Sequence, residues 1–199
     1  MKKIETIWHY LLWSAVEKKQ YRHTQAGLAA DFGYSLSTVN LALARPTAIG
    51  AIRKSGKFFV LADYKKLLYF WATARTLSRD ILYHTRAPQS VRELAGIAPP
   101  GAVFAGYSAA SKLLGEPPAD YTKLYLYVSP DRLQQAALRY PKATYGPSEI
   151  IILRLPQALG TFGSVTTLPW TFVDIWNMSD WYAHDFAAAL EEKIYGLLS

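Results

Sequence analysis

The chain of 199 residues contains no cysteine. This absence excludes disulfide bonds, a thiol nucleophile and metal sites built from thiolates. A glycine-rich loop of the kind that cradles phosphate groups is also missing. Three of the histidines, His9, His23 and His84, are scattered without the spacing of metal ligands. We therefore expect neither a metal ion nor a cofactor.

Long hydrophobic runs are missing as well. No stretch of about 18 consecutive apolar residues occurs, so we expect no membrane-spanning segment. The chain starts with "MKKIE", and His9 and Glu17 continue the polar side of a helical pattern. This pattern predicts an amphipathic helix rather than a signal peptide, and we expect a cytoplasmic protein.

Acidic residues are scarce in the first part of the chain. Residues 1–75 hold 12 Lys and Arg against 4 Asp and Glu, whereas residues 76–199 hold 10 against 11. The net charge of +7 therefore originates in the first 75 residues. A localised positive excess favours an anionic partner, most often nucleic acid. A basic surface that only keeps the protein soluble is the alternative.

Two helices joined by a glycine turn are predicted in this basic region. Ahead of them, an apolar face at helical spacing predicts a first helix, with Ile4, Ile7, Trp8, Leu11, Leu12 and Ala15. Thr24 is a suitable N-cap for a short helix over "QAGLAADF", and Gly33 suits a left-handed helix end. Ser35 or Ser37 can cap the next helix. This order predicts a helix-turn-helix.

The helix after the turn, over "LSTVNLALAR", has two different faces. Leu36, Val39 and Leu43 are expected to pack inward, and Pro46 is expected to end the helix. The residues expected to face outward are Ser37, Thr38, Asn40, Ala44 and Arg45. Their polar members are of the types that bond base edges and phosphates.

A basic hairpin is predicted directly after this helix. Two strand-like runs in "IGAIRKSGKFFVLAD" flank Lys54-Ser55-Gly56, and Arg53, Lys54 and Lys57 gather at the tip. A hairpin in this position is a wing, and its charges suit contact with phosphates.

Asp63 is expected to cap a further helix, over "YKKLLYFWATARTL", whose Lys65 and Lys66 would add affinity for an anionic partner. The turn, the polar third helix, the basic hairpin and the uneven charge together predict a winged helix-turn-helix DNA-binding domain over residues 1–78. Winged helices also bind proteins, so an interaction module that docks through its third helix is an alternative.

Strands and helices alternate over residues 79–199. We expect "LSRDILYHTRAPQS" to be a linker and Ser90 to cap a short helix. Strands are expected over "AVFAG", "TKLYLYV", "EIIILRL" and "WTFVDIW", and helices over "SAASKLLG", "DRLQQAALRY" and "SDWYAHDFAAALEEKIYGLL". The alternation predicts a small mixed-sheet α/β domain for partner binding, dimerisation or sensing. The predicted fold class of the chain is thus α/β (α+β).

The turn "GYSAAS", residues 106–111, raises the question whether Ser108 is a nucleophile. Ser108, Asp174 and His184 follow the chain order of the α/β-hydrolase triad. Residue 110, where that motif has glycine, is alanine, and the second domain is too short for a large hydrolase sheet. A serine hydrolase is therefore the weakest alternative.

Two other kinds of enzyme lack the residues that their chemistry needs. An active nucleotidyltransferase would need two carboxylates on "TKLYLYV" to hold its metal ions. Lys123, Tyr125 and Tyr127 stand there instead, which leaves a catalytically inactive relative as an alternative. A serine–lysine pair would need serine at residue 109, which is alanine. We expect no catalytic residue, and we expect Ser108 to be the N-cap of a packed helix.

Several stretches together resemble the AbiE-type (type IV) antitoxin family of transcriptional regulators. The N-terminal winged helix of that family looks like "TQAGLAADFGYSLSTVNLAL" and "IGAIRKSGKFFVLADYKKLLYFWATARTL". Its C-terminal part is similar to "VFAGYSAASKLLG", "TKLYLYV" and "FVDIWNMSDWYAHDFAAAL". The resemblance implies a repressor of its own operon whose cognate toxin is a nucleotidyltransferase; a stand-alone regulator is equally compatible.

The resemblance also implies where double-stranded DNA would bind. The contact residues would be Ser37, Thr38, Asn40 and Arg45 on the third helix, with Arg53, Lys54 and Lys57 in the hairpin. Repressors of this type usually pair across two half-sites, so we expect a homodimer.

Overall fold

The computed structural model describes residues 1–157 and 162–198, which divide into two compact units. Unit 1 holds residues 1–75 together with the residues from Ile194 onward, and unit 2 holds residues 76–193. The fold is mixed α/β. Among the described residues, unit 1 has a three-stranded sheet and unit 2 has a four-stranded sheet.

The boundary between the units differs from the predicted one between residues 78 and 79. The first unit ends at residue 75, and it also takes up the end of the C-terminal helix. Ile194 is fully buried, Lys65 lies over the ring of Tyr195, and Lys19 Nζ donates to the carbonyl oxygen of Leu197. These contacts join residues that are far apart in the chain.

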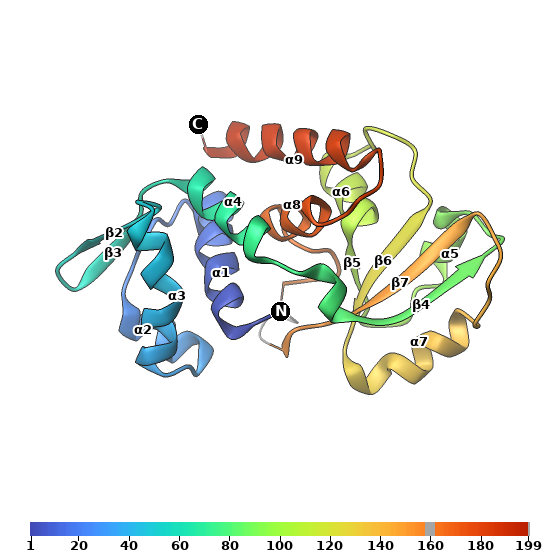
Figure 1. Cartoon of the computed structure of the whole chain (residues 1–199), viewed down its shortest axis with the longest axis horizontal. Coiled ribbons are helices and arrows are strands. Elements are labelled where there is room, and N and C mark those ends of the chain that lie inside the picture. Colours follow the sequence, from blue (N-terminus) through green and yellow to red (C-terminus); the bar gives the residue numbers. More distant parts are fainter. Residues whose placement is uncertain (158–161, 199) are drawn as a thin grey trace. The chain divides into compact units, whose positions relative to one another are not determined.

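Unit 1 combines helices with a small antiparallel sheet (Figure 1). Its elements are α1 (Lys3–Lys18), β1 (Arg22–His23), α2 (Gln25–Phe32), α3 (Leu36–Ala48), β2 (Ile52–Ser55), β3 (Phe58–Leu61) and α4 (Tyr64–Ala74). The strands pair in the order β1-β3-β2. The hairpin of β2 and β3 turns at Gly56, whose φ of 59° is open to glycine without strain.

Side chains cap the helices of unit 1 at the predicted places. Thr24 Oγ1 accepts a hydrogen bond from the backbone N–H of Gly27 at 2.9 Å. Of the two serines considered for α3, Ser35 is the cap, because its Oγ accepts from the N–H of Thr38 at 3.2 Å. Gly33 ends α2 in the left-handed conformation, with φ at 61°. Caps satisfy N–H groups that the first helical turn leaves unpaired.

Two predictions about α3 are wrong. Pro46 does not end the helix, which continues to Ala48. Proline lacks the N–H that would bond the carbonyl oxygen four residues earlier, and here the indole Nε1 of Trp8 donates to that oxygen, on Ala42, at 2.7 Å. Leu36 does not pack inward but is 53% exposed, because it lies in the first turn of α3, beside the hairpin.

The polar side of α1 is partly buried rather than solvated. Glu5 Oε2 accepts a hydrogen bond from Trp71 Nε1 at 3.2 Å and lies 3.5 Å from the guanidinium of Arg75. Its other oxygen accepts from the N–H of Lys2 at 3.0 Å. His9 is fully buried, with its ring 5.9 Å from that of Trp71. These groups hold α1 against α4, which Asp63 caps as predicted.

Unit 2 is built around a mixed sheet with the strand order β4-β7-β6-β5. Its elements are β4 (Ile81–Ala87), α5 (Val91–Gly96), β5 (Val103–Ala105), α6 (Gly106–Leu114), β6 (Lys123–Val128), α7 (Leu133–Arg139), β7 (Ser148–Arg154), α8 (Leu168–Trp176) and the start of α9 (Ala183–Leu198), with short 3-10 helices at Leu77–Asp80 and Pro130–Arg132. The central strands β6 and β7 are parallel, and the outer pairings are antiparallel.

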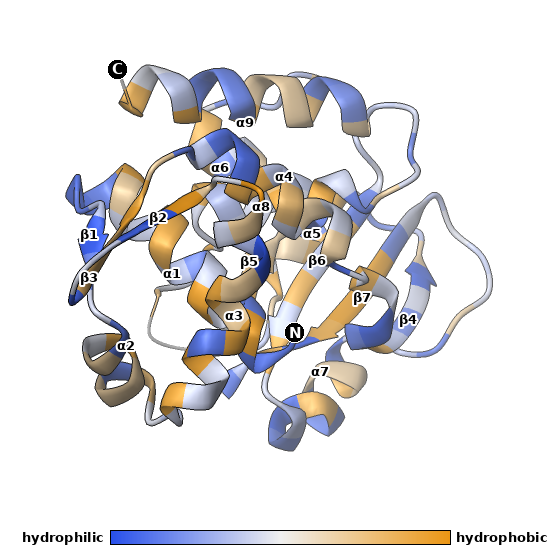
Figure 2. Cartoon of the chain, turned by 60° about the vertical axis from the view of Figure 1, so that its left-hand side comes forward, coloured by the Kyte–Doolittle hydropathy of each residue, from blue (hydrophilic) through white to orange (hydrophobic). Residues whose placement is uncertain are grey.

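Helices cover both faces of this sheet. The α5 and α7 face has an apolar core, and β7 is hydrophobic over most of its length (Figure 2). On the opposite face, α6 packs against α8 and β6. Of the helices that the structure describes, none is both long enough and apolar enough to cross a membrane.

Two segments of unit 2 differ from their predicted structure. The predicted linker contains the edge strand β4, whose His84 and Arg86 both pair with Glu149 on β7, at 3.0 and 2.8 Å. Because of these polar residues, the sequence of β4 does not show the pattern by which a strand is predicted. The predicted strand "WTFVDIW" is part of α8, which is buried from Leu168 to Ile175. A helix that is buried on all sides shows no clear alternation of apolar and polar faces, so its sequence resembles a buried strand.

Burial lowers the pKa of His9 from its ordinary value of 6.5 to about 3. The unfolded chain therefore takes up a proton below pH 6.5 that the folded chain does not, and stability falls as the pH decreases from 6.5 toward 3. We expect His9 to account for a loss of about 2 kcal/mol between pH 7 and pH 5. Urea unfolding at both pH values measures this loss, and His9→Gln should reduce it. An equal loss in the variant would show that His9 is not its source.

Candidate nucleic-acid interface

One face of α3 is exposed along the whole helix and carries mostly small and polar side chains. We call it the outer stripe of α3, and it consists of Ser37, Asn40, Leu41, Ala44, Arg45 and Ala48. Spacings of three and four residues place these positions on one side of a helix. The opposite side is fixed by the buried residues Val39, Ala42, Leu43 and Pro46.

The structure places the predicted contact residues of α3 in two different environments. Ser37, Asn40 and Arg45 are exposed, whereas Thr38 is half-buried beside the stripe. The hydroxyl of the cap Ser35 lies 2.8 Å from that of Ser37 and 3.0 Å from that of Thr38. These hydroxyls therefore already have a bonding partner at the start of α3. Asn40 and Arg45 carry the stripe's longer polar side chains.

Sequence reasoning missed Leu41, which is 66% exposed in the middle of the outer stripe. The prediction considered polar residue types and passed over an apolar one. The signal was present, because residue 41 lies four positions from both Ser37 and Arg45 and must share their side of the helix.

The hairpin presents its three predicted cations to solvent. Arg53 and Lys54 lie on β2 and Lys57 lies in the turn, and all three are exposed. None of them forms an ion pair with an acidic residue in the described part of the chain. Arg53 and Lys54 are consecutive in a strand, so their side chains leave the hairpin on opposite faces. The hairpin can therefore offer positive charge in two directions.

The fold brings the hairpin and the start of α3 together. Lys54, Gly56 and Lys57 line a groove of about 450 Å³ whose other wall is formed by Leu36 and the first residues of α2. The hairpin and the start of α3, which are 18 or more residues apart in the chain, thus line the same groove. Arg45 does not line this groove and borders a separate hollow near α1 and α4.

The two lysines at the start of α4 make contacts inside unit 1. Lys66 Nζ lies 3.7 Å from the carboxylate of its own helix cap, Asp63. Lys65 Nζ lies 5.3 Å from the ring centre of Tyr195 and 5.7 Å from that of Tyr69. Both lysines therefore serve the packing of α4 in addition to any role toward a partner.

In unit 2, Ser108 is not a helix cap. Helix α6 begins at Gly106, two residues earlier than predicted, and Ala105 occupies the N-cap position without a side-chain bond. Gly106 has a φ of 52°, and its missing side chain leaves room for Tyr125 and Met178. Ser108 is 4% exposed, and its Oγ has no hydrogen-bond partner among the described residues.

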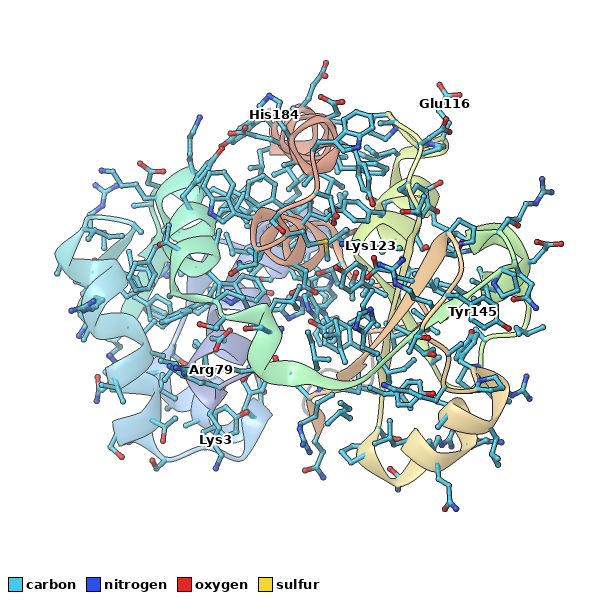
Figure 3. The ribbon with its side chains drawn as sticks, turned by 45° about the vertical axis from the view of Figure 1, so that its right-hand side comes forward. Lys3, Arg79, Glu116, Lys123, Tyr145 and His184 are labelled. Carbon is cyan, nitrogen blue, oxygen red and sulfur yellow. The ribbon has the colours of Figure 1, made fainter. Side chains whose placement is uncertain are left out.

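The three residues of the hydrolase hypothesis do not form a hydrogen-bonded array. The Oδ2 atom of Asp174 accepts a bond from Tyr127 at 2.7 Å. His184 lies on the exposed outer side of α9 (Figure 3). Ser108 donates to neither of them, since no described group accepts its proton. This arrangement lacks the bond between nucleophile and base that activates a serine.

The β6 side chains at the expected carboxylate positions belong to a structural network. Lys123 Nζ lies 2.7 Å from Asp180 Oδ1, and Tyr107 donates to the other oxygen of Asp180 at 2.9 Å. Burial and this bond raise the pKa of Tyr107 above its ordinary value. Burial also raises the pKa of Tyr125. Across residues 1–157 and 162–198, no group of three or more His, Asp or Glu side chains is placed to hold a metal ion.

Because Ser108 buries an unpaired hydroxyl, we expect Ser108→Ala to leave the free energy of unfolding unchanged or to raise it by about 1 kcal/mol. Ser90, which caps α5 through the N–H of Glu93 at 3.3 Å, is the matched control. Its change to alanine should cost about 1 kcal/mol. Urea unfolding of the two variants measures both values. A clear loss of stability in Ser108→Ala would mean that the hydroxyl has a partner after all.

Comparison of the chain with models of protein families, with curated proteins and with solved structures finds no match.

Proposed function

We propose that the protein is a sequence-specific DNA-binding transcriptional regulator that acts as a repressor. In this proposal unit 1 is a winged helix-turn-helix, α3 lies in the major groove, and the hairpin of β2 and β3 contacts the phosphate backbone. The observation that carries the proposal is the groove in which Lys54 and Lys57 of the hairpin face the start of α3.

The order of elements in unit 1 supports this assignment. A helix-turn-helix unit needs two helices joined by a tight turn, and α2 and α3 are joined at Gly33, Tyr34 and Ser35. The hairpin follows α3 after three residues, so the cations are held beside the helix proposed for recognition. An α-helix fits the major groove, which is about 12 Å wide.

The charge of unit 1 supports an anionic partner. The cations of residues 1–75 outnumber the acids by 12 to 4, and one of those acids, Glu5, is buried against Arg75. Lysine and arginine residues that neutralise phosphates release counterions, which makes binding strong at low salt and weak at high salt. The exposed hairpin cations are suited to this role.

The finer parts of the proposal rest on the sequence resemblance. They are an antitoxin-like role, a nucleotidyltransferase toxin as partner, a homodimer on two half-sites and a cytoplasmic location. Unit 2 would then serve partner binding, dimerisation or sensing. The proposal assigns no catalytic residue.

The direct test is binding of the whole chain to duplex DNA from upstream of its own gene. A scrambled duplex of equal length is the comparison, and both are titrated at two salt concentrations. Preference for the native duplex, weakening with salt, would support a sequence-specific regulator. Equal binding to both duplexes would contradict sequence specificity, and no binding at low salt would overturn the DNA-binding proposal itself.

Changing Arg53 and Lys54 together to alanine should weaken binding to every duplex. The loss of one or two phosphate contacts should reduce the slope of log affinity against log salt by about one to two units. The matched control is a double change to alanine at Arg92 and Lys193, two exposed cations of unit 2. It removes the same charge and should leave the slope unchanged. If both double variants gave the wild-type slope, Arg53 and Lys54 would have no contact with phosphates.

Asn40→Ala should act on sequence preference instead. An amide side chain that bonds a base edge contributes about 1–3 kcal/mol of discrimination. We therefore expect the ratio of affinities for the native and scrambled duplexes to fall toward one, at nearly constant affinity for the scrambled duplex. Gln134, an exposed amide on α7, provides the control variant. Equal losses on both duplexes would make Asn40 a phosphate contact.

A further inference from the structure

Leu41 lies halfway along the length of the outer stripe and is largely open to solvent. Leu41 is 66% exposed, more than any other large apolar residue of α3. A single exposed leucine is common on protein surfaces, so exposure alone indicates nothing. The position of Leu41 makes its exposure relevant, because Leu41 lies among the residues that are proposed to face DNA.

The line that runs along the helix through the centre of the outer stripe consists of small side chains. At 100° per residue, Ser37, Ala44 and Ala48 lie within a narrow arc, with Asn40 on one flank and Leu41 on the other. Small residues allow the helix backbone to approach another surface closely. The two larger side chains, the amide of Asn40 and the aliphatic group of Leu41, then extend toward that surface on either side of the small residues.

The base edges in the major groove present one group that suits an amide side chain and one that suits an aliphatic side chain. Adenine presents N6 and N7 to an amide, and thymine presents its C5-methyl group, the apolar feature that a side chain such as leucine can contact. An A·T pair therefore displays both features in the same groove. A G·C pair displays only hydrogen-bonding groups there.

We propose that Leu41 contacts the C5-methyl group of thymine and thereby selects A·T pairs where α3 enters the major groove. This inference rests on the proposed function and adds the class of sequence that the site prefers. Leu41 is a specificity-determining residue in this account, and its neighbour Asn40 supplies the polar half of the recognition.

A protein partner would be the other use of an exposed leucine, since Leu41 also borders a hollow of about 310 Å³ with Trp8 and Phe70. Two observations favour DNA. The exposed charged residues around this hollow, Lys2 and Arg45, are both cationic, and the stripe that carries Leu41 continues with the polar side chains of Ser37 and Asn40.

The test removes the methyl group from the DNA and leaves the base pairing unchanged. The duplex from upstream of the gene is prepared with thymine and, separately, with uracil at every thymine position. The whole wild-type chain should bind the uracil duplex about fourfold more weakly for one contacted methyl group, the factor expected from burying one carbon group. Leu41→Ala should bind the thymine duplex with this weakened affinity and should no longer distinguish the two duplexes.

Leu138→Ala is the matched control, because Leu138 is exposed like Leu41, at 77%, but lies on α7 of unit 2 and not on the outer stripe. It should keep the wild-type ratio of affinities. A wild-type ratio of one would overturn the inference, and so would a Leu41→Ala variant that keeps the full ratio, since the methyl groups would then act through DNA shape. In either case salt-sensitive, sequence-specific binding of the thymine duplex would leave the proposed function standing. If neither duplex were bound at low salt, the proposed function would fail and the inference with it.

Discussion

The indole N–H of Trp8 donates to the carbonyl oxygen of Ala42, the acceptor that Pro46 leaves without its helical partner. The same indole meets the ring of Phe70 edge-on, with 4.9 Å between ring centres, so one side chain connects α1, α3 and α4. Because α3 stays helical as far as Ala48, Ala48 remains on the same side as Ser37. The length of the outer stripe therefore depends on a residue of another helix.

A second polar contact of the core has a similar role. Glu5 accepts from Trp71 and pairs with Arg75, and it thereby joins the start of α1 to the end of α4. A buried carboxylate without such partners would be strongly unfavourable, so its geometry is tightly defined. A few polar bonds within an apolar interior thus fix the positions of the helices of unit 1 relative to one another. The buried side of the unit thereby determines where the exposed residues of α3 and the hairpin lie.

Much of unit 1 could be predicted because its signals are local. The caps Thr24, Ser35 and Asp63 act within three residues of their own positions, and so does the left-handed Gly33. Two of the wrong predictions involve partners that are distant in the chain. Trp8 donates to the carbonyl oxygen that Pro46 leaves unpaired in α3, and β4 is a strand through its pairing with β7, which lies far along the chain. The exposed polar residues of the candidate interface follow from spacing, whereas the groove that brings Lys54 and Lys57 to the start of α3 follows from tertiary structure alone.

Unit 1 combines residues 1–75 with the residues from Ile194 onward. Ile194 is part of its buried interior, and Lys19 and Lys65 contact the residues that follow it. A ribosome delivers the chain from its N-terminus, and domains generally fold in that order. Unit 1 begins the sequence but obtains its last contacts only after all of unit 2 has been synthesised. The contacts of Lys19 and Lys65 with Leu197 and Tyr195 can therefore form only after unit 2 has been synthesised.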